Sequence, residues 1–514
     1  NSQAMAANHE KHGLLLAAAI LLLLLFLLAK LRRRRKKYGG VPLNPPPGPW
    51  QLPVIGSMHH LVGALPHRAM RDLALRHGPL MLLRMGELPV VVASSAAAAR
   101  DVLKTHDAAF ATRPRTNTIA TLDGDGLGFA LAPYGDHWRR VRKLCVTELL
   151  GAPRVRSFQG TREAEAAALV ASVAAAAASG DVVNVSSLVS TYVVDAAVRV
   201  IVGDRIAGRD AFLACLEEGL RLSSGFSLAD LFPSSRLARA LSRRSRQVEA
   251  AAQEMSRVMD GVIEEKRARK AAGNGMGREE EQDILDVLLD GGGTAPLDIG
   301  TIRAVVRDLF GAGSESSAST LQWAMAELMR RPAALRRAQA EVRGALAGQS
   351  RVREEALQEL PYLRLVIKET LRLHATVPLM LPRESREATR VLGYDVPQGT
   401  MVLVNAWAIG RDAATFGADA EEFRPERFEE GTAAALDFRG TDFELLPFGA
   451  GRRMCPGITF GLAVMELALA SLLFHFDWEL PGGTVELDMA ETFGVTAKMK
   501  NDLWLHAAVV VPPL

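Results

Sequence analysis

The chain carries the sequence Phe448-Gly449-Ala450-Gly451-Arg452-Arg453-Met454-Cys455-Pro456-Gly457. Its glycines allow the backbone to turn tightly and to approach a ligand closely. The two arginines near Cys455 are expected to lower the pKa of its thiol. A helical pattern starts just after the cysteine and points its positive end toward the sulfur. The stretch therefore predicts a loop that holds a single thiolate.

A lone thiolate favours haem over other metal centres. The 514 residues include three cysteines, Cys145, Cys215 and Cys455, whereas a structural zinc site or an iron–sulfur cluster needs about four cysteine or histidine ligands. A dinucleotide-binding loop is the alternative for the glycines, but Met454 stands where its third glycine is required and no βαβ pattern follows. Cys145 and Cys215 lie in no such loop and are interpreted as small buried hydrophobic residues.

The cysteine loop is similar to the Phe-x-x-Gly-x-Arg-x-Cys-x-Gly signature of the cytochrome P450 family. Other segments resemble that family in the expected order: Trp138-Arg139-Arg140-Val141-Arg142, Glu369-Thr370-Leu371-Arg372 and Pro425-Glu426-Arg427-Phe428. Details such as Pro46-Pro47-Gly48-Pro49-Trp50 resemble the plant A-type group, clan seventy-one. The resemblance implies a mainly α fold with small β-sheets, preceded by one N-terminal transmembrane helix.

The resemblance also implies how a haem b would be held. Cys455 is the expected axial ligand of the iron, in a loop that includes Phe448, Gly451 and Gly457. The residues implied to bind the haem propionates are Trp138, Arg142, Arg383 and Arg453.

Other matched residues are implied to have structural or docking roles and no catalytic role. Glu369, Arg372 and Arg427 are implied to form a buried structural network. Arg139, Arg140 and Lys143 are expected to face solvent, where an acidic NADPH–cytochrome P450 reductase docks. Cytochrome b5 is a further expected partner.

Polar residues interrupt a helical pattern over residues 297–330. The segment Gly311-Ala312-Gly313-Ser314-Glu315-Ser316-Ser317 weakens the helix and favours a distortion. It resembles the family's Ala-Gly-x-Asp/Glu-Thr motif, which implies that Glu315 is the acid and Ser316 the alcohol that deliver protons. Ser316 replaces the usual threonine and is less restricted in its rotamer. A looser coupling of oxygen consumption to product formation is therefore expected. A serine-hydrolase elbow is the alternative, but its second glycine and preceding strand are missing.

The segments through which the family contacts substrate are mostly apolar here, which suits a hydrophobic ligand. The residues expected to line the pocket are Leu309, Ala312, Val377, Leu379, Val495 and Thr496. Phe226, Leu228, Leu231 and Phe232 are expected to dip into a membrane and admit lipophilic molecules.

The N-terminal segment predicts a signal anchor rather than a cleaved signal peptide. Residues 13–29 carry no charge and are long enough for a bilayer helix, and the basic cluster follows them instead of preceding them. The rule that positive charge stays cytosolic then puts the rest of the chain in the cytosol, on the endoplasmic reticulum membrane. The expected division is an anchor over 1–37, a proline-rich hinge over 38–50 and a catalytic domain over 51–514. With the anchor removed the chain has a net charge of +3 − 7 = −4, which disfavours nucleic acid as a partner.

Periodicity predicts a mostly helical domain with little sheet. Helices are expected over 66–77, 93–105, 136–150, 158–179, 208–224, 235–271, 297–330, 332–347, 362–374 and 458–475, and strands over 80–85, 89–92, 400–404 and 504–506.

The expected function is that of a haem-thiolate monooxygenase that uses NADPH through a reductase, with a sesqui- or diterpene as the leading substrate. Phenylpropanoids, indoles and alkaloids are alternative substrates. A reductase-independent isomerase or dehydratase acting on hydroperoxides, and a haem sensor, are alternative functions. The motif around Glu315 and Ser316 disfavours the isomerase or dehydratase, which needs no proton relay.

Overall fold

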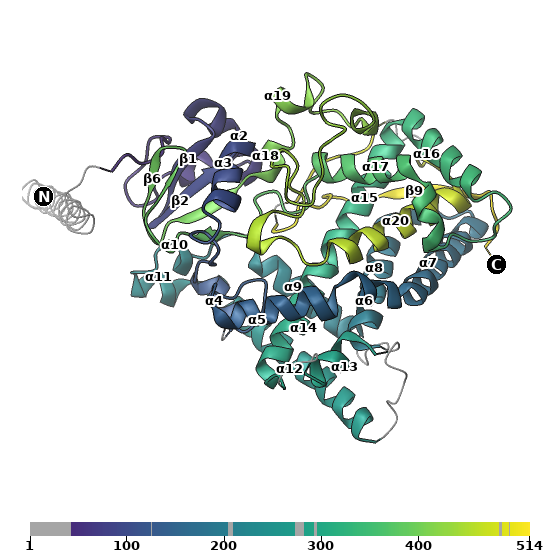
Figure 1. Ribbon diagram of the computed structural model, residues 1–514, viewed down its shortest axis with the longest axis horizontal. Coiled ribbons are helices and arrows are strands. Elements are labelled where there is room, and N and C mark those ends of the chain that lie inside the picture. Colours follow the sequence, from purple (N-terminus) through teal and green to yellow (C-terminus); the bar gives the residue numbers. More distant parts are fainter. Residues whose placement is uncertain are drawn as a thin grey trace, which may run out of the picture. The chain divides into compact units, whose positions relative to one another are not determined.

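Helices dominate the computed structural model, which describes residues 43–124, 126–203, 209–272, 282–291, 296–482, 486–492 and 494–513 (Figure 1). In the first half of the chain they are α2 (Pro66–His77), α3 (Ala96–Arg100), α4 (Asn117–Asp123), α5 (Asp136–Leu144), α6 (Ala152–Ser157), α7 (Gln159–Ser179), α8 (Val185–Val202), α9 (Arg209–Ser223), α10 (Leu228–Leu231), α11 (Arg236–Leu241) and α12 (Arg243–Ala271). The remaining helices are α13 (Ile284–Leu289), α14 (Ile299–Gly313), α15 (Glu315–Arg330), α16 (Pro332–Ala345), α17 (Pro361–Leu373), α18 (Ala406–Ile409), α19 (Ala413–Phe416) and α20 (Ile458–His475). Every expected helical range contains a helix, so the mainly α fold class is confirmed.

Three small sheets complete the fold. Strands β1 (Leu80–Met85), β2 (Leu88–Ala93), β7 (Met401–Val404) and β4 (Arg383–Glu384) form one sheet in that order, with β2 and β7 parallel and the other pairs antiparallel. Strands β3 (Val183–Asn184), β9 (Trp504–Val509) and β8 (Phe476–Glu479) form a second, antiparallel sheet. Strands β5 (Thr389–Val391) and β6 (Tyr394–Val396) pair in a third. The four predicted strands are confirmed.

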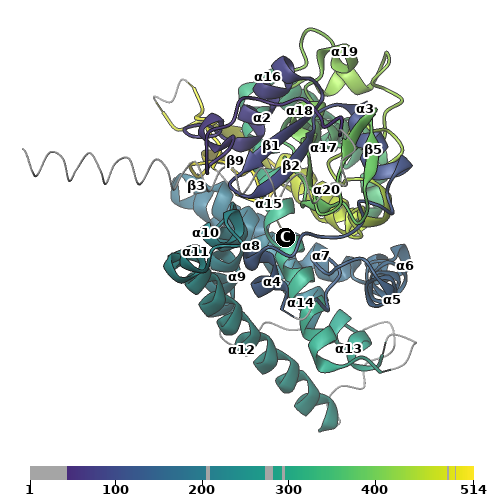
Figure 2. The same cartoon turned by 90° about the vertical axis from the view of Figure 1, so that its left-hand side faces the viewer.

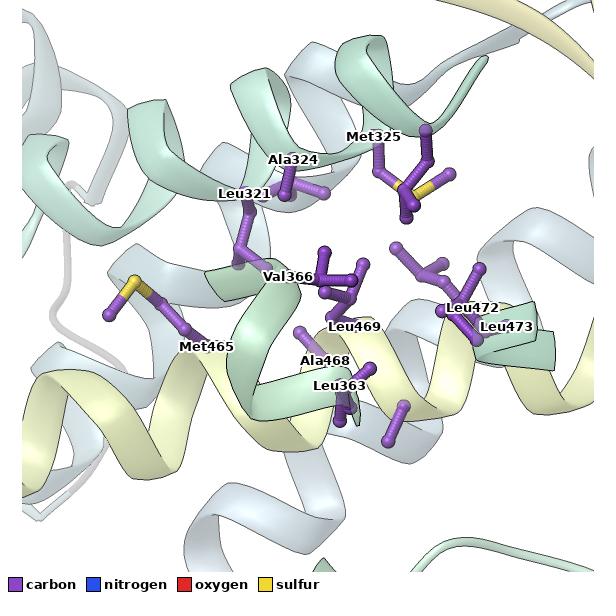
Figure 3. Packing of buried hydrophobic residues seen from close by; sticks show 14 of the residues in the cluster. Leu321, Ala324, Met325, Leu363, Val366, Met465, Ala468, Leu469, Leu472 and Leu473 are labelled. Atoms are coloured by element: carbon purple, nitrogen blue, oxygen red, sulfur yellow. The ribbon is translucent and has the colours of Figure 1, made fainter. Parts of the chain in front are cut away.

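The largest part of the core lies where α15, α17 and α20 meet (Figure 3). Leu321 of α15, Val366 of α17 and Leu469 of α20 point toward one another there. The apolar side chains of α20 continue around the whole helix, as expected for a helix enclosed on all sides. Because α20 begins at Ile458, directly after the cysteine loop, this core anchors the loop at its C-terminal side.

Helix α8 was not expected from the sequence. Its many valines are stiff, β-branched residues of lower helix propensity, and it is buried on most of its circumference, so no clear period marks it. Both α8 and α20 are long and apolar enough to cross a bilayer, but most of each is buried within the protein, as in an interior helix.

Two long predicted helices are interrupted. The range 235–271 divides at Ser242, whose hydroxyl caps α12, and 297–330 divides at Ser314. Helix α12 packs against α9, α4 and α14, and α9 and α12 lie side by side in Figure 2.

The predicted anchor, residues 1–37, lies outside the described residues, as do residues 38–42 of the expected hinge. The chain from Pro46 onward forms one compact unit. Pro46 and Pro49 are buried, and the backbone N–H of Leu82 in β1 donates to the carbonyl oxygen of Pro47 at 2.8 Å. The end of the proline-rich segment is therefore packed on the sheet.

Candidate active site

The cysteine loop has a backbone that only glycine adopts readily. Gly449 and Gly451 both have a φ of +69°, and a Cβ on Gly451 would lie 2.2 Å from the carbonyl oxygen of Leu103. The backbone N–H of Cys455 donates to the carbonyl oxygen of Phe448 at 2.9 Å and closes the loop. Gly457 follows as the N-cap of α20, and a Cβ there would lie 3.9 Å from Sγ of Cys455. These constraints place Phe448, Gly451 and Gly457 around one half-buried thiol.

The adjacent arginines do not act on the thiol as expected. Burial raises the pKa of Cys455, while the backbone N–H of Gly457 and the charge of Arg142 lower it by less. Arg452 instead contacts Asp107 at 3.1 Å and the hydroxyl of Tyr134 at 3.1 Å. Arg453 donates to the carbonyl oxygens of Ala111, Phe129 and Ala132. The prediction that these two arginines lower the pKa is wrong, because both side chains turn away from the sulfur.

The expected propionate-binding residues come together beside this loop. Arg142 donates to the carbonyl oxygen of Met454, and Arg383 donates to that of Ala450 at 3.0 Å. The guanidinium of Arg453 lies 4.2 Å from the ring centroid of Trp138. Burial, followed by repulsion from Arg383 and Arg142, lowers the pKa of Arg453 to about 9.

Arg113 belongs to the same cluster and was missed. It is buried and donates to the carbonyl oxygens of Ala130, Leu381 and Pro382. Burial lowers its pKa, and the charges of Arg453, Arg383 and Arg142 lower it further. The available signal was a charge two residues after the apolar run Ala109-Phe110-Ala111, because an unpaired arginine next to a buried segment is costly.

The arginine cluster, which we define as Arg113, Arg142, Arg383 and Arg453, is short of negative charge. Asp107 pairs with Arg383 at 3.2 Å. The hydrogen bonds that the other three arginines make within the described residues all go to neutral carbonyl oxygens. Buried guanidinium groups that repel one another favour an anionic ligand. The cluster therefore fits a ligand that carries carboxylates.

The predicted helix distortion is confirmed at Ser314, between α14 and α15. The hydroxyl of Ser316 donates to the carbonyl oxygen of Ala312 at 2.8 Å. Phe310 and Ser314 are buried, yet Ala312 is exposed and a Cβ on Gly311 or Gly313 would meet no atom within 4 Å. One face of the break therefore borders open space, which a bound ligand can fill. Glu315 opens α15, and its carboxylate pairs with Nζ of Lys498 at 3.0 Å.

Comparison with known proteins agrees with this geometry. The family model for cytochrome P450 matches residues 45–505. The chain belongs to the cytochrome P450 family. Desmethyl-deoxy-podophyllotoxin synthase of Sinopodophyllum hexandrum is 46% identical over 472 residues, which cover 90% of this chain and 92% of that protein. Ent-cassadiene hydroxylase of Oryza sativa subsp. japonica is 47% identical over 485 residues, covering 92% and 93%.

A solved structure also shares the fold of this cytochrome P450. The zebra fish cytochrome P450 with progesterone has a TM-score of 0.72 at 23% identity, and the match covers 86% of this chain and 99% of that chain. Family membership makes the protein a plant haem-thiolate monooxygenase of the clan seventy-one type. It uses haem with a cysteine thiolate ligand and takes electrons from NADPH through a reductase.

Hydrogen bonds connect the substrate-side segments of this P450. The hydroxyls of Thr320 in α15 and Thr376 lie 2.9 Å apart, and the backbone N–H of Ala497 donates to the carbonyl oxygen of Thr376 at 2.8 Å. These bonds join α15 to the loops that carry Val377, Leu379, Val495 and Thr496. Asp308 of α14 accepts from the backbone N–H groups of Phe129 and Ala130 at 2.8 and 2.9 Å, which adds the loop before α5.

The expected pocket residues differ in exposure. Ala312 is exposed, and Val377 and Val495 are half-buried. Thr496 is buried. Leu309 is buried among the side chains around Phe129 and Phe310, and Leu379 packs against the sheet residues near Met401. Leu309 and Leu379 are therefore partly packed into the hydrophobic core.

The expected membrane-dipping residues are only partly exposed. Leu228 is 49% exposed, but Leu231 is buried, and Phe226 and Phe232 pack against its cluster. Leu231 ends the short helix α10 and points inward, so the expectation is wrong for this residue, while Phe226 and Phe232 on either side of α10 are half-buried. Among the cysteines, Cys145 is buried, as expected, and burial raises its pKa to about 12. Cys215 is only half-buried.

Glu369 is the centre of a buried network. Arg372 donates to both of its carboxylate oxygens at 2.7 Å, and Nε of Arg427 donates to Oε1 at 2.8 Å. All three residues are buried. Arg372 also donates to the carbonyl oxygens of Gly410 and Ala420, so the network ties α17 to the segments that follow β7.

The basic residues of α5 face outward. Arg139, Arg140 and Lys143 are exposed, whereas Trp138, Val141 and Leu144 on the opposite side are buried. Arg139 pairs with Asp136 of the same helix.

Proposed function

We propose that this cytochrome P450 inserts one oxygen atom from O2 into a hydrophobic small molecule, with a terpenoid as the substrate, at a site built around Cys455. The observation that supports this most strongly is the arginine cluster, which is short of negative charge and lies against the cysteine loop. That loop leads directly into α20, which packs against α15 after the break at Ser314.

Haem fits the residues that are present. Cys455 would ligate the iron, and Phe448, Gly451 and Gly457 shape the loop that holds it. Arg113, Arg142, Arg383 and Arg453, together with Trp138, would hold the two propionates, whose carboxylates would supply the missing negative charge. When bound, the haem supplies the iron centre at which O2 is reduced and cleaved.

Glu315 and Ser316 move protons on the oxygen side. The carboxylate of Glu315 is 23% exposed and can exchange protons with water. The hydroxyl of Ser316 gives up its hydrogen bond to Ala312, passes its proton into the site and takes the next one from Glu315. The open helix face at Gly311 and Gly313 leaves room for this exchange.

The pocket determines the class of substrate. In this proposal Leu309, Ala312, Val377, Leu379, Val495 and Thr496 line it, and their mostly apolar side chains suit a hydrocarbon skeleton. The relative from Oryza sativa is named a hydroxylase of ent-cassadiene, and others are named for 5-epiaristolochene, premnaspirodiene and dolabradiene. These names favour a sesqui- or diterpene over a phenylpropanoid, indole or alkaloid. Because one relative is named for a podophyllotoxin-type product, the test below also includes substrates that are not terpenes.

The protein works at the endoplasmic reticulum membrane, with residues 1–37 as a single anchor, 38–50 as a hinge and 51–514 as the cytosolic catalytic domain. Exposed apolar side chains in two segments that meet at the turn Gly86-Glu87 support contact with lipid. The backbone N–H groups of this turn donate to the carbonyl oxygens of Ile55 and Leu231. Exposed apolar residues in the segments around Ile55 and Leu231 include Trp50, Val54, Val62, Leu237 and Leu241. NADPH–cytochrome P450 reductase docks at Arg140 and Lys143 of α5, and cytochrome b5 is a further partner.

The test is turnover in microsomes that contain the full chain and a plant reductase. Terpenes, phenylpropanoids and indoles are offered with NADPH, and products are detected by mass spectrometry. A terpene product heavier by one oxygen atom is the expected result. Turnover of hydroperoxides without NADPH would instead make the protein an isomerase or dehydratase. In the same samples Cys455→Ala should abolish the thiolate spectrum of the ferrous carbon monoxide complex, whereas the control Cys215→Ala should keep it.

A further inference from the structure

Lys498 and Glu315 form an ion pair beside the helix break. Their charged atoms Nζ and Oε1 are 3.0 Å apart, and the two side chains are 41% and 23% exposed. Within the described residues, Lys498 is the one side chain that pairs with the Glu315 carboxylate.

The loop that carries Lys498 is fastened to the same helix as Glu315. The carbonyl oxygen of Ala497 accepts from the hydroxyl of Ser319 and from the indole N–H of Trp323, both at 3.1 Å. Ser319 and Trp323 follow Glu315 in α15 by about one and two helical turns, so the three residues share a face of the helix. The neighbouring backbone of Lys498 is therefore fixed relative to Glu315.

Further hydrogen bonds fix the loop that carries Lys498. The backbone N–H of Val495 donates to the hydroxyl of Ser224 at 3.0 Å, and that of Thr492 donates to the carbonyl oxygen of Lys498 at 2.9 Å. An ordinary exposed ion pair has to order two long, mobile side chains and gains little. Here the backbone of Lys498 is already ordered by these hydrogen bonds, so the ion pair is suited to orienting the carboxylate of Glu315.

We propose that Lys498 is a positioning residue that holds the Glu315 carboxylate at the solvent-accessible side of the helix break and so sets where protons enter the route to Ser316. The inference rests on the proposed role of Glu315 and adds a residue from outside the acid and alcohol pair. Lys498 itself transfers no proton. Without it the carboxylate rotates freely, proton delivery slows, and more of the electrons from NADPH end as hydrogen peroxide instead of product.

A set of matched variants of the full-length protein tests this proposal with reductase and a turned-over substrate. Lys498→Met should lower the product formed per NADPH by about two- to fivefold, since it removes orientation but leaves the acid in place. Lys498→Arg should restore it. The double variant Lys498→Met with Glu315→Gln should be no worse than Glu315→Gln alone, because residues that act through one another are not additive. Lys500→Met, at an exposed lysine of the same loop, is the control and should match the parent.

A measurement without turnover checks the pair itself. After reductive methylation with 13C-formaldehyde, the Lys498 resonance is identified by its loss in Lys498→Arg, and the motion of its methyl groups is measured by NMR relaxation. The Lys498 side chain should move more freely in Glu315→Gln than in the parent, because an ion pair restricts a long side chain. Equal mobility in the two proteins would overturn the ion pair. Equal product per NADPH in Lys498→Met and the parent, or independent effects of the two substitutions, would overturn the positioning role. If the parent forms no product at all, the proposed function fails, and the relaxation measurement still decides whether the pair exists.

Discussion

Thr118 and Asp230 are joined by two hydrogen bonds between parts of the chain that are far apart in sequence. The backbone N–H of Thr118 donates to Oδ1 of Asp230 at 2.8 Å, and its hydroxyl donates to Oδ2 at 2.6 Å. Both residues are buried. Thr118 lies in α4 and Asp230 in α10, so the pair fastens α4 to the segment between α9 and α12.

Thr118→Val should destabilise the protein by about 1.5–3 kcal/mol, the usual contribution of a hydrogen bond to a charged group. The substitution removes one donor at nearly constant volume. The control is Thr121→Val in the same helix, where the hydroxyl bonds to the neutral carbonyl oxygen of Asn117 at 2.9 Å. Thermal unfolding of both variants, followed by far-ultraviolet circular dichroism, makes the comparison. Equal losses of stability at the two positions would mean that the hydrogen bond to Asp230 contributes no more than one to a neutral carbonyl oxygen.

Arg427→Ala should cost about 3–5 kcal/mol of stability, because it leaves part of the buried Glu369 carboxylate without its partner. Arg424→Ala is the matched control. The Arg424 side chain is 53% exposed, and its contact with Glu369 is made by the backbone N–H, which alanine keeps. The yield of folded protein and the unfolding midpoint measure the difference. A folded Arg427→Ala protein with normal stability but no turnover would move this residue from structure to chemistry.

Glu491 should make the stability depend on acid pH. Burial by itself raises its pKa, but hydrogen bonds from His67 and Arg68 outweigh burial and lower it from 4.5 to about 2. A carboxyl whose pKa is depressed on folding stabilises the protein above its unfolded pKa, and the effect is lost as the pH falls toward the folded pKa. The contribution near pH 7 is about 3 kcal/mol at 1.36 kcal/mol for each pKa unit.

The variant Glu491→Gln should therefore be less stable than the parent near neutral pH, and the gap should narrow between about pH 4.5 and pH 2. Unfolding midpoints measured across this range give the gap directly. Glu479→Gln, at an exposed position of β8, serves as the control and should show no such trend. A difference that stays constant with pH would show that Glu491 acts through packing and not through its charge.

Arg140→Glu and Lys143→Glu should raise the reductase concentration needed for half-maximal turnover by about three- to tenfold at low salt, because charges at the rim of an interface steer association. The effect should shrink at higher ionic strength, where screening shortens the reach of the charges to about 10 Å or less. Arg351→Glu, an exposed arginine in the loop after α16, is the control. Turnover of both α5 variants at saturating reductase should equal that of the parent. A loss that persists there would point to damage at the haem site behind α5.

Local signals were sufficient for most of the fold. The period of apolar residues predicts α2, α7, α16 and α17, because each presents a face to the core. The sequence did not predict helix α8, because α8 is buried on nearly every side and rich in valine, and its apolar residues therefore show no clear helical period. The break at Ser314 was predictable, since glycines and hydroxyls inside an apolar helix act on their own backbone.

The family motifs in the chain were enough to predict a thiolate loop, an acid and alcohol pair and the Glu369–Arg372 ion pair, because each motif is short and keeps its residues adjacent or one helical turn apart. The partners that complete these motifs come from distant segments. Arg113 joins the arginine cluster and Lys498 meets Glu315 through the path of loops in space, and Arg452 and Arg453 turn from the sulfur toward Asp107 and the loop before α5. Such contacts depend on which surfaces the packed helices bring together, and burial then sets the charge balance and pKa values that sequence spacing does not contain.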